Sequence, residues 1–235
     1  MTSENESYFC MCIAPQDVSE EAKRALAGRK AALLKECRWQ AGDRITIKFL
    51  EGDSTLRKKV RTVAESWTEP GMANLTLSFV DTGSADVRVA FMPGNWSWSY
   101  LGTFCRSISA DNPTMNYGWL TPDSTEVEIR RVVLHEFGHA LGLIHEHQNP
   151  MQAIKWNEAA VIRDLSGPPN NWDIYTIRHN VLNRYDPTTV ITTPVDKESI
   201  MLYPIPKAWT LDGFSSGLNS VLSKVDKDFI RDCYP

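Results

Sequence analysis

The spacing of histidines between positions 135 and 147 constrains this chain more than any other feature of its sequence. Four of the five histidines fall in this stretch, which begins with the letters HEFGH. On a helix, side chains four residues apart lie on the same face about one turn apart, so His135 and His139 can bind one ion together. A continued helix would rotate His145 away from this face. Gly142 can take a positive φ, end the helix and let His145 turn back toward the other two.

Three imidazoles in this arrangement favour a catalytic zinc site. Three nitrogen ligands leave the fourth position of tetrahedral Zn²⁺ open for water, whereas structural sites are closed by four protein ligands. Zinc bound in this way lowers the pKa of its water to about 7 and polarises a carbonyl oxygen. Glu136 lies next to a ligand, and its carboxylate can accept the proton of that water. We therefore expect His135, His139 and His145 to bind one Zn²⁺ ion, with Glu136 as the general base.

Length and composition place these residues in a folded globular chain. It has 235 residues, 42% hydrophobic and 23% charged, with 25 Lys and Arg against 29 Asp and Glu. A net charge of -4 without a dense basic run predicts no nucleic-acid partner. No stretch approaches the roughly 18 apolar residues that a membrane helix needs, so we expect no membrane span. The first eight residues lack the basic start and apolar core of a secretory signal, which leaves the compartment open.

Hydrophobic periodicity predicts a mixed sheet that carries helices. Alternating apolar residues such as Ile45 and Ile47 indicate a half-buried strand over 43–49. Thr125, with Glu128 three residues later, is a capping-box pattern that opens the histidine-bearing helix. Segments rich in Pro and Gly predict little regular structure in the C-terminal half. The other expected elements are helices over 19–39, 54–67 and from Ser223 toward Cys233, strands over 74–80, 85–91 and 115–120, and an irregular loop over 95–116.

Longer motifs resemble a known clan of peptidases. The run HEFGHALGLIH from His135 to His145 resembles the signature of the metzincin zinc peptidases. Metzincins also have a methionine turn beneath the metal, and SIMLY at Ser199–Tyr203 resembles the astacin form of that turn. Glu146 is similarly of astacin type, and the family pairs this residue with the mature N-terminus. The chain is thus similar to a microbial astacin- and matrixin-like branch over about residues 40–235, including the segments 94–103, 113–120, 167–172 and 200–205.

The resemblance implies an α+β fold, namely a metzincin-like (zincin) catalytic domain. Its twisted mixed sheet would carry helices, with upper and lower subdomains around a zinc cleft. Residues 1–40 would form an N-terminal extension and helix, and residues 41–235 the catalytic domain. Within that domain we expect an N-terminal subdomain over about 41–145 and a C-terminal subdomain over about 146–235.

The implied function is that of a zinc metalloendopeptidase that hydrolyses peptide bonds in proteins or peptides. Met201 would support the ligands without touching the substrate. Tyr203 matches the position at which astacins carry a tyrosine that contacts the zinc or the oxyanion, where its phenol could donate a hydrogen bond. An extended substrate would add as a strand to the sheet edge at Met115–Leu120.

Other interpretations stay open at this point. The chain could be a non-catalytic zinc-containing module that holds a glycan or protein with its aromatic loops, although such a module has no need of a base like Glu136. It could also be a metalloprotease that acts on one dedicated partner. His147 suits a solvated or supporting role better than ligation, and His179 has no expected role. Cys10 and Cys12 could cap the zinc with a thiolate, as in relatives of this clan, or form disulfides with Cys37, Cys105 or Cys233.

Overall fold

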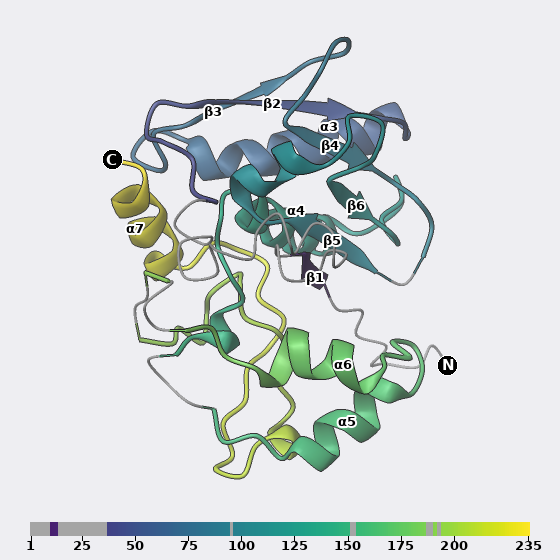
Figure 1. Cartoon of the computed structure of the whole chain (residues 1–235), viewed down its shortest axis with the longest axis vertical. Coiled ribbons are helices and arrows are strands. Elements are labelled where there is room, and N and C mark those ends of the chain that lie inside the picture. Colours follow the sequence, from purple (N-terminus) through teal and green to yellow (C-terminus); the bar gives the residue numbers. More distant parts are fainter. Residues whose placement is uncertain (1–9, 14–36, 95, 151–153, 187–189, 192–193) are drawn as a thin grey trace.

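A six-stranded mixed sheet forms the upper part of the described protein in Figure 1, which shows a computed structural model. The structure describes residues 10–13, 37–94, 96–150, 154–186, 190–191 and 194–235. The strand order is β1-β5-β6-β4-β2-β3, and β5 and β6 form the antiparallel pair, while the other described pairs are parallel. The strands are β1 (Cys10–Ile13), β2 (Arg44–Phe49), β3 (Thr76–Phe79), β4 (Val87–Ala90), β5 (Ser97–Tyr100) and β6 (Met115–Tyr117).

The strands predicted from alternation are confirmed, and two strands, β1 and β5, were missed. Ile45 and Ile47 of β2 are buried, as the period of two requires. The expected irregular loop over 95–116 is wrong at β5, because Ser97 and Ser99 are the buried residues there and the aromatic side chains between them are not fully buried. β5 packs against the histidine-bearing helix, and small side chains allow that close approach. Its polar residues face inward, which hides the strand from a search for apolar alternation.

Two helices pack on the sheet and against each other. α3 (Ser54–Ala64) continues into the 3₁₀ turn η2 (Glu65–Thr68), and α4 (Glu126–Ala140) follows β6. The Thr125 side chain caps α4 by accepting from the backbone N–H of Glu128. The Glu128 carboxylate instead accepts from Trp119 Nε1 and from Arg131, so only half of the predicted capping box forms.

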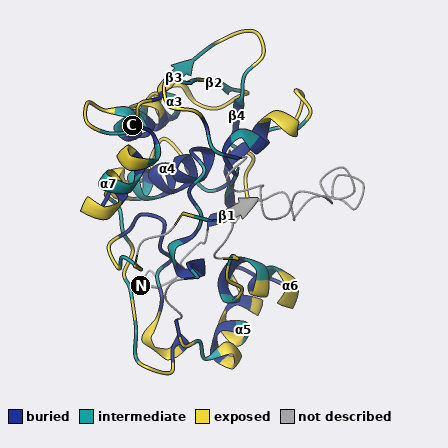
Figure 2. Ribbon diagram, turned by 60° about the vertical axis from the view of Figure 1, so that its left-hand side comes forward, coloured by how far each residue is buried: buried dark blue, intermediate teal, exposed yellow. Residues whose placement is uncertain are grey.

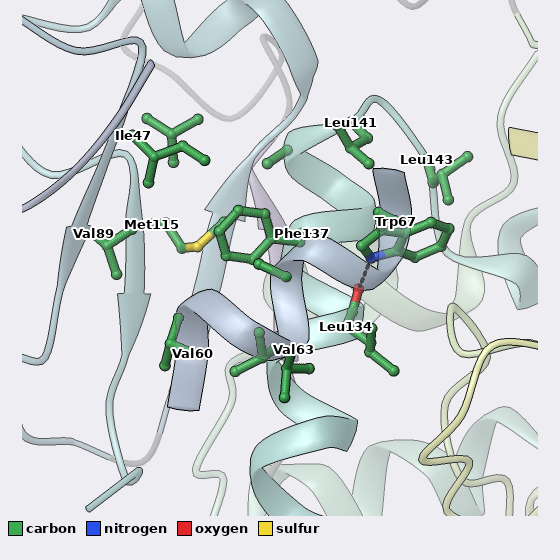
Figure 3. Close-up of a cluster of buried hydrophobic side chains, with 14 of the residues drawn as sticks. Ile47, Val60, Val63, Trp67, Val89, Met115, Leu134, Phe137, Leu141 and Leu143 are labelled. Carbon is green, nitrogen blue, oxygen red and sulfur yellow. Dashed lines mark hydrogen bonds between the residues drawn. The ribbon is translucent and has the colours of Figure 1, made fainter. Parts of the chain in front are cut away.

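The interior of the protein is built around α4. From Val132 to Ala140 every residue of this helix is buried, and Figure 2 shows it as a dark blue helix near the middle of the molecule. Helices that are apolar on most sides occur in the interior of a domain. Trp67 packs beside it and donates from Nε1 to the carbonyl of Leu134 at 3.0 Å (Figure 3). Side chains of the sheet and of α3 complete this core, among them Ile47, Val60, Val63, Val89 and Met115.

The C-terminal half holds more helix than the sequence indicated. Its elements are η4 (Glu146–Gln148), α5 (Glu158–Ser166), α6 (Ile174–Ile177), η5 (Arg178–Leu182), η6 (Lys207–Trp209) and α7 (Lys224–Cys233), while η3 (Gly102–Ser107) lies in the first half. Asn157 caps α5, whose buried Val161 and Leu165 join a second apolar cluster with Trp172. The Gly-Pro-Pro segment that suggested irregular structure marks only the end of α5. No helix in the described ranges is long and apolar enough to span a membrane.

The prediction of a final helix beginning at Ser223 is confirmed. Ser223 and Asp226 form a complete capping box at the start of α7. By contrast, most of the helix expected over 19–39 falls outside the described residues, and residues 37–39 are not helical.

Asp226 also connects α7 to the turn that contains Met201. Its carboxylate accepts from Ser199 Oγ at 2.7 Å and from the backbone N–H of Ile200 at 2.8 Å, as well as from Ser223 N–H at 2.9 Å. Met201 packs against Gly138 of α4, where a Cβ atom would collide with its sulfur. One buried carboxylate therefore holds the methionine turn beneath the histidine-bearing helix.

We expect Asp226→Ala to lower the free energy of unfolding by about 2–4 kcal/mol, because it removes a cap and leaves buried donors without acceptors. Urea denaturation followed by tryptophan fluorescence measures this loss. Asp173→Ala, which removes the exposed cap of α6, is the matched control and should cost less. Equal losses in the two variants would contradict the role given to Asp226.

Candidate metal centre

Three imidazoles from two segments converge at one point of the protein. His135 and His139 lie one turn apart on α4, and His145 returns from the segment that follows it. The Nε2 atom of His139 lies 3.1 Å from Nε2 of His135 and 3.1 Å from Nε2 of His145. All three residues are buried. Among the described residues, they form the cluster of His, Cys, Asp or Glu side chains whose spacing could hold a metal ion. The spacing argument from the sequence is confirmed in its geometry.

A glycine turn at the end of α4 brings the third imidazole back. Gly142 has a φ of +93°, in the left-handed region that favours glycine. Its N–H donates to the carbonyl of His139, and the N–H of Leu143 donates to the carbonyl of Gly138, which is the Schellman pattern of a helix end. The reversed chain direction then places His145 beside the two histidines on the helix.

Each imidazole is oriented by a hydrogen bond at its other nitrogen. Nδ1 of His135 donates to the carbonyl of Ile200 and Nδ1 of His139 to that of Leu143, both at 2.8 Å. Nδ1 of His145 lies 3.2 Å from Oε1 of Gln148. Because these oxygens can only accept, the protons sit on Nδ1 and each Nε2 presents a lone pair.

This donor set fits a tetrahedral cation. Lone pairs that face one another at 3.1 Å repel unless a positive charge lies between them. Zinc–nitrogen bonds of 2.0–2.1 Å place the ligand nitrogens of a tetrahedron about 3.3 Å apart, close to the spacing observed. Burial lowers the pKa of all three histidines, that of His139 to about 4, so the rings are in the neutral form that binds metal.

Glu136 is a buried carboxyl group without an N–H or O–H donor. It is fully buried on α4 beside His135, and neither carboxylate oxygen accepts from an N–H or O–H group in the described part of the chain. Burial raises its pKa well above the usual range, and the nearby Cys10 thiol and Arg131 oppose this shift only in part. Buried polar groups are normally paired, so a carboxyl group left unpaired next to potential ligands indicates a functional role.

Tyr203 lies in the site where the sequence predicted it. Its ring centroid is 4.4 Å from that of His145 and 6.0 Å from that of His135. Its hydroxyl donates to the backbone carbonyl of Cys10 in β1. The hydroxyl can therefore bind a peptide carbonyl beside the three imidazoles.

The edge of the sheet near the histidines differs from what the sequence predicted. β1 pairs in parallel with β5, with Cys10 opposite Ser97, so it covers the outer side of that strand. The expectation that Met115–Leu120 forms the sheet edge is wrong, because β6 lies between β5 and β4. The Cys10 side chain is buried near Glu136 and is not part of the described metal-ligand group.

The remaining histidines and cysteines have structural surroundings. His147 is buried, stacks on His145 with 5.1 Å between ring centroids, and lies 2.8 Å from the carbonyl of Asn180 through Nε2. This agrees with the expected supporting role. His179 stacks on Tyr175. The expected disulfides do not involve Cys10, Cys105 or Cys233, which are free thiols, and the Cys12 side chain lies outside the described part.

A cavity beside the third imidazole is lined by two acids, of which Asp226 is buried and Glu146 is partly buried. Glu146 and Asp226 line it together with apolar side chains, including Met201, Phe229 and Tyr234. Burial raises the pKa of Glu146 to about 7, an effect that Asp226 strengthens and that a hydrogen bond from Asp196 N–H opposes. Glu146 is therefore largely protonated below neutral pH.

Comparisons with known proteins agree with this site. No protein-family model matches the sequence, and no curated protein sequence matches it significantly. A structure of myroilysin is 41% identical, with a TM-score of 0.83, over 86% of this chain and 97% of its own. A crystal structure of myroilysin matches 98% of this chain and 92% of its own at 37% identity and a TM-score of 0.70. High choriolytic enzyme 1, a hatching-enzyme zinc protease from the medaka fish Oryzias latipes, shares the fold at 17% identity, with a TM-score of 0.55 over 83% of this chain and 93% of its own.

These similarities define the class of the protein as a zinc metalloendopeptidase with an α+β metzincin fold. Within that class, the chain belongs to the astacin family. Membership of this class confirms the expectation of one catalytic Zn²⁺ ion and of protein substrates. It also sets aside the alternative of a non-catalytic binding module.

Sequence reasoning named the three histidines, Glu136 and Tyr203 as site residues, and it did not indicate Gln148 or β1. Gln148 lies three residues after His145, but nothing in that spacing indicates that its amide reaches an imidazole. β1 is a four-residue strand whose sequence, CMCI, lacks alternation of apolar and polar residues.

The raised pKa of Glu146 predicts a loss of stability with rising pH. An unfolded chain loses the proton near pH 4.5 and the folded chain near 7, so the unfolded state is favoured progressively between these values. The free energy of unfolding should fall by about 3 kcal/mol from pH 4 to pH 8 through this group. Chemical denaturation of the zinc-loaded protein at several pH values, compared with Glu146→Gln, isolates its contribution. Parallel pH profiles for the two proteins would contradict the assignment.

Proposed function

We propose that His135, His139 and His145 hold the zinc of this protease, that Glu136 is the general base, and that Tyr203 donates a hydrogen bond to the oxyanion. The observation that carries the proposal is the convergence of three Nε2 lone pairs beside an unpaired buried carboxyl group. Structural zinc sites contain four protein ligands and need no base, whereas catalytic sites combine three ligands with a proton acceptor.

The chemistry divides between the metal and the side chains. Zinc held by the three imidazoles supplies the positive charge that polarises a peptide carbonyl and acidifies a water molecule. Glu136 takes a proton from the attacking water at a carboxylate oxygen and later delivers it to the leaving amine nitrogen. Burial makes this carboxylate a stronger proton acceptor than one in water. Peptide hydrolysis by this route needs no covalent intermediate.

Tyr203 suits the role of an oxyanion donor because of what it already binds. The Cys10 carbonyl, which accepts from its hydroxyl, stands in for the carbonyl of a substrate peptide. As that carbonyl gains negative charge during attack, the hydrogen bond from the phenol strengthens. Contacts with His145 and His147 hold the ring in place.

The substrate would bind along β5. An extended peptide adds as a strand to an available sheet edge, and β5 is the strand to which β1 now pairs. A substrate that pairs with β5 therefore takes the place of β1. In this proposal the subdomains over 41–145 and 146–235 flank the bound peptide.

We expect Glu136→Gln to lower the rate of protein hydrolysis by at least about 100-fold, because the amide cannot accept the proton. The measurement is cleavage of an unfolded protein by the zinc-loaded chain, before and after a brief trypsin treatment that is stopped with a serine protease inhibitor. Trypsin is included to remove β1, because β1 pairs with the strand β5 along which the substrate is proposed to bind.

The control for this variant is its zinc content. Glu136→Gln should retain one zinc per chain and the unfolding midpoint of the unmodified protein, so that the loss concerns proton transfer alone. Hydrolysis that continues at a similar rate in the metal-loaded variant would refute the role of Glu136.

Tyr203→Phe should lower kcat by about 100-fold or more while changing KM little, because the hydroxyl acts on charge that develops after substrate binding. Steady-state kinetics with a peptide substrate separates the two parameters. An unchanged kcat would assign Tyr203 to packing against the histidines instead.

A further inference from the structure

Gln148 connects the third imidazole to the C-terminal half of the chain. The side chain is buried, and its Oε1 lies 3.2 Å from Nδ1 of His145. Its Nε2 donates to the backbone carbonyl of His179 at 2.6 Å and to that of Asn183 at 3.0 Å. The backbone carbonyl of Gln148 also accepts from the backbone N–H of Tyr185 at 3.1 Å. Gln148 therefore contacts both ends of η5 and the residues that follow it.

These partners fix which way round the amide lies. Two carbonyl oxygens can only accept, so the group that faces them must be the –NH₂ group with its two donors. The oxygen of the amide then faces His145, and it can only accept. The proton on His145 must accordingly sit on Nδ1, which leaves the lone pair on Nε2. The backbone around η5 thus determines the tautomer of His145 through Gln148.

His145 differs in this respect from the other two imidazoles. His135 and His139 donate to carbonyl groups of the main chain, at Ile200 and Leu143. The acceptor for His145 is a side chain, whose position depends on a separate segment more than 30 residues away in sequence. Stacking against His147 restricts the tilt of the His145 ring but does not select its tautomer.

We propose that Gln148 is a positioning residue that prepares His145 for the metal and couples metal binding to the order of residues 178–185. This inference rests on the proposed role of His145 as a ligand. Groups that hydrogen-bond to a metal-binding imidazole fix its orientation and raise its basicity, and their loss typically costs about 10–100-fold in metal affinity. Coupling between two sites is reciprocal, so metal binding must in turn stabilise the segment that holds Gln148.

The first test measures zinc affinity of the full chain by competition with a chromophoric chelator. Gln148→Met keeps the size of the side chain and removes its hydrogen bonds, so zinc binding should weaken about 10–100-fold. The matched control is Asn180→Ala, which removes a buried amide on the same segment that donates to Thr176 and does not touch His145. Its zinc affinity should stay within about twofold of the unmodified protein.

Gln148→Glu separates the two functions of the amide, which are to accept from His145 and to donate to the segment around η5. It also replaces Gln148→Met as the test if the methionine variant does not fold. The carboxylate can still accept from His145 Nδ1, so zinc affinity should remain closer to that of the unmodified chain than in Gln148→Met. It has no donors for the carbonyls of His179 and Asn183, so the side-chain connection from residue 148 to η5 is lost.

Hydrogen exchange provides the readout of coupling. In the unmodified chain, zinc removal should speed exchange of the backbone amides of Asn183 and Tyr185, which donate to Arg178 and Gln148. In Gln148→Glu the exchange of the same amides should depend much less on zinc, because the side-chain bonds to His179 and Asn183 are gone. Exchange independent of zinc in the unmodified chain would overturn the coupling.

The ligand assignment is tested separately with His145→Asn. If this variant binds zinc as well as the unmodified chain, the proposed function fails at His145. If it loses zinc while Gln148→Met retains full affinity, the ligand role stands and the positioning role of Gln148 is refuted.

Discussion

The protein depends on holding three mutually repelling lone pairs at one point. The Nε2 atom of His139 faces those of His135 and His145, each at 3.1 Å, an arrangement that only a cation makes favourable. The chain maintains it with one hydrogen bond at the far side of each ring. Because these bonds hold the neutral rings in place, much of the cost of ordering the ligands is met by folding rather than by metal binding.

The supports of the site lie in places far apart in sequence. The glycine turn after α4 supplies the Leu143 carbonyl and directs the chain back toward the helix. The methionine turn supplies the Ile200 carbonyl, and Asp226 of α7 fixes that turn through the backbone N–H of Ile200. If these histidines hold the metal as proposed, its affinity depends on residues that never approach the ion, and changes at Asp226 are expected to act on both stability and the order of the histidines.

Local sequence patterns predicted the parts of the site that local geometry determines. The spacing of His135 and His139 on a helix, the glycine at 142 and the start of a helix at Ser223 are each decided within a few residues. Contacts between distant segments were not accessible in this way. β5 buries its serines against α4, Gln148 reaches η5, and the position of β6 inside the sheet follows from pairing with β5. These depend on what a residue meets in the folded chain, which its neighbours in sequence do not encode.

The link from α7 to His135 has a consequence for truncation of the protein. The carboxylate in the cap of α7 anchors the turn that orients His135. A shortened variant without α7 would retain all three imidazoles, yet the Ile200 carbonyl that orients the first of them would lose its anchor. Deletion mapping would then assign this helix to the hydrolytic centre, although none of its side chains touches an imidazole.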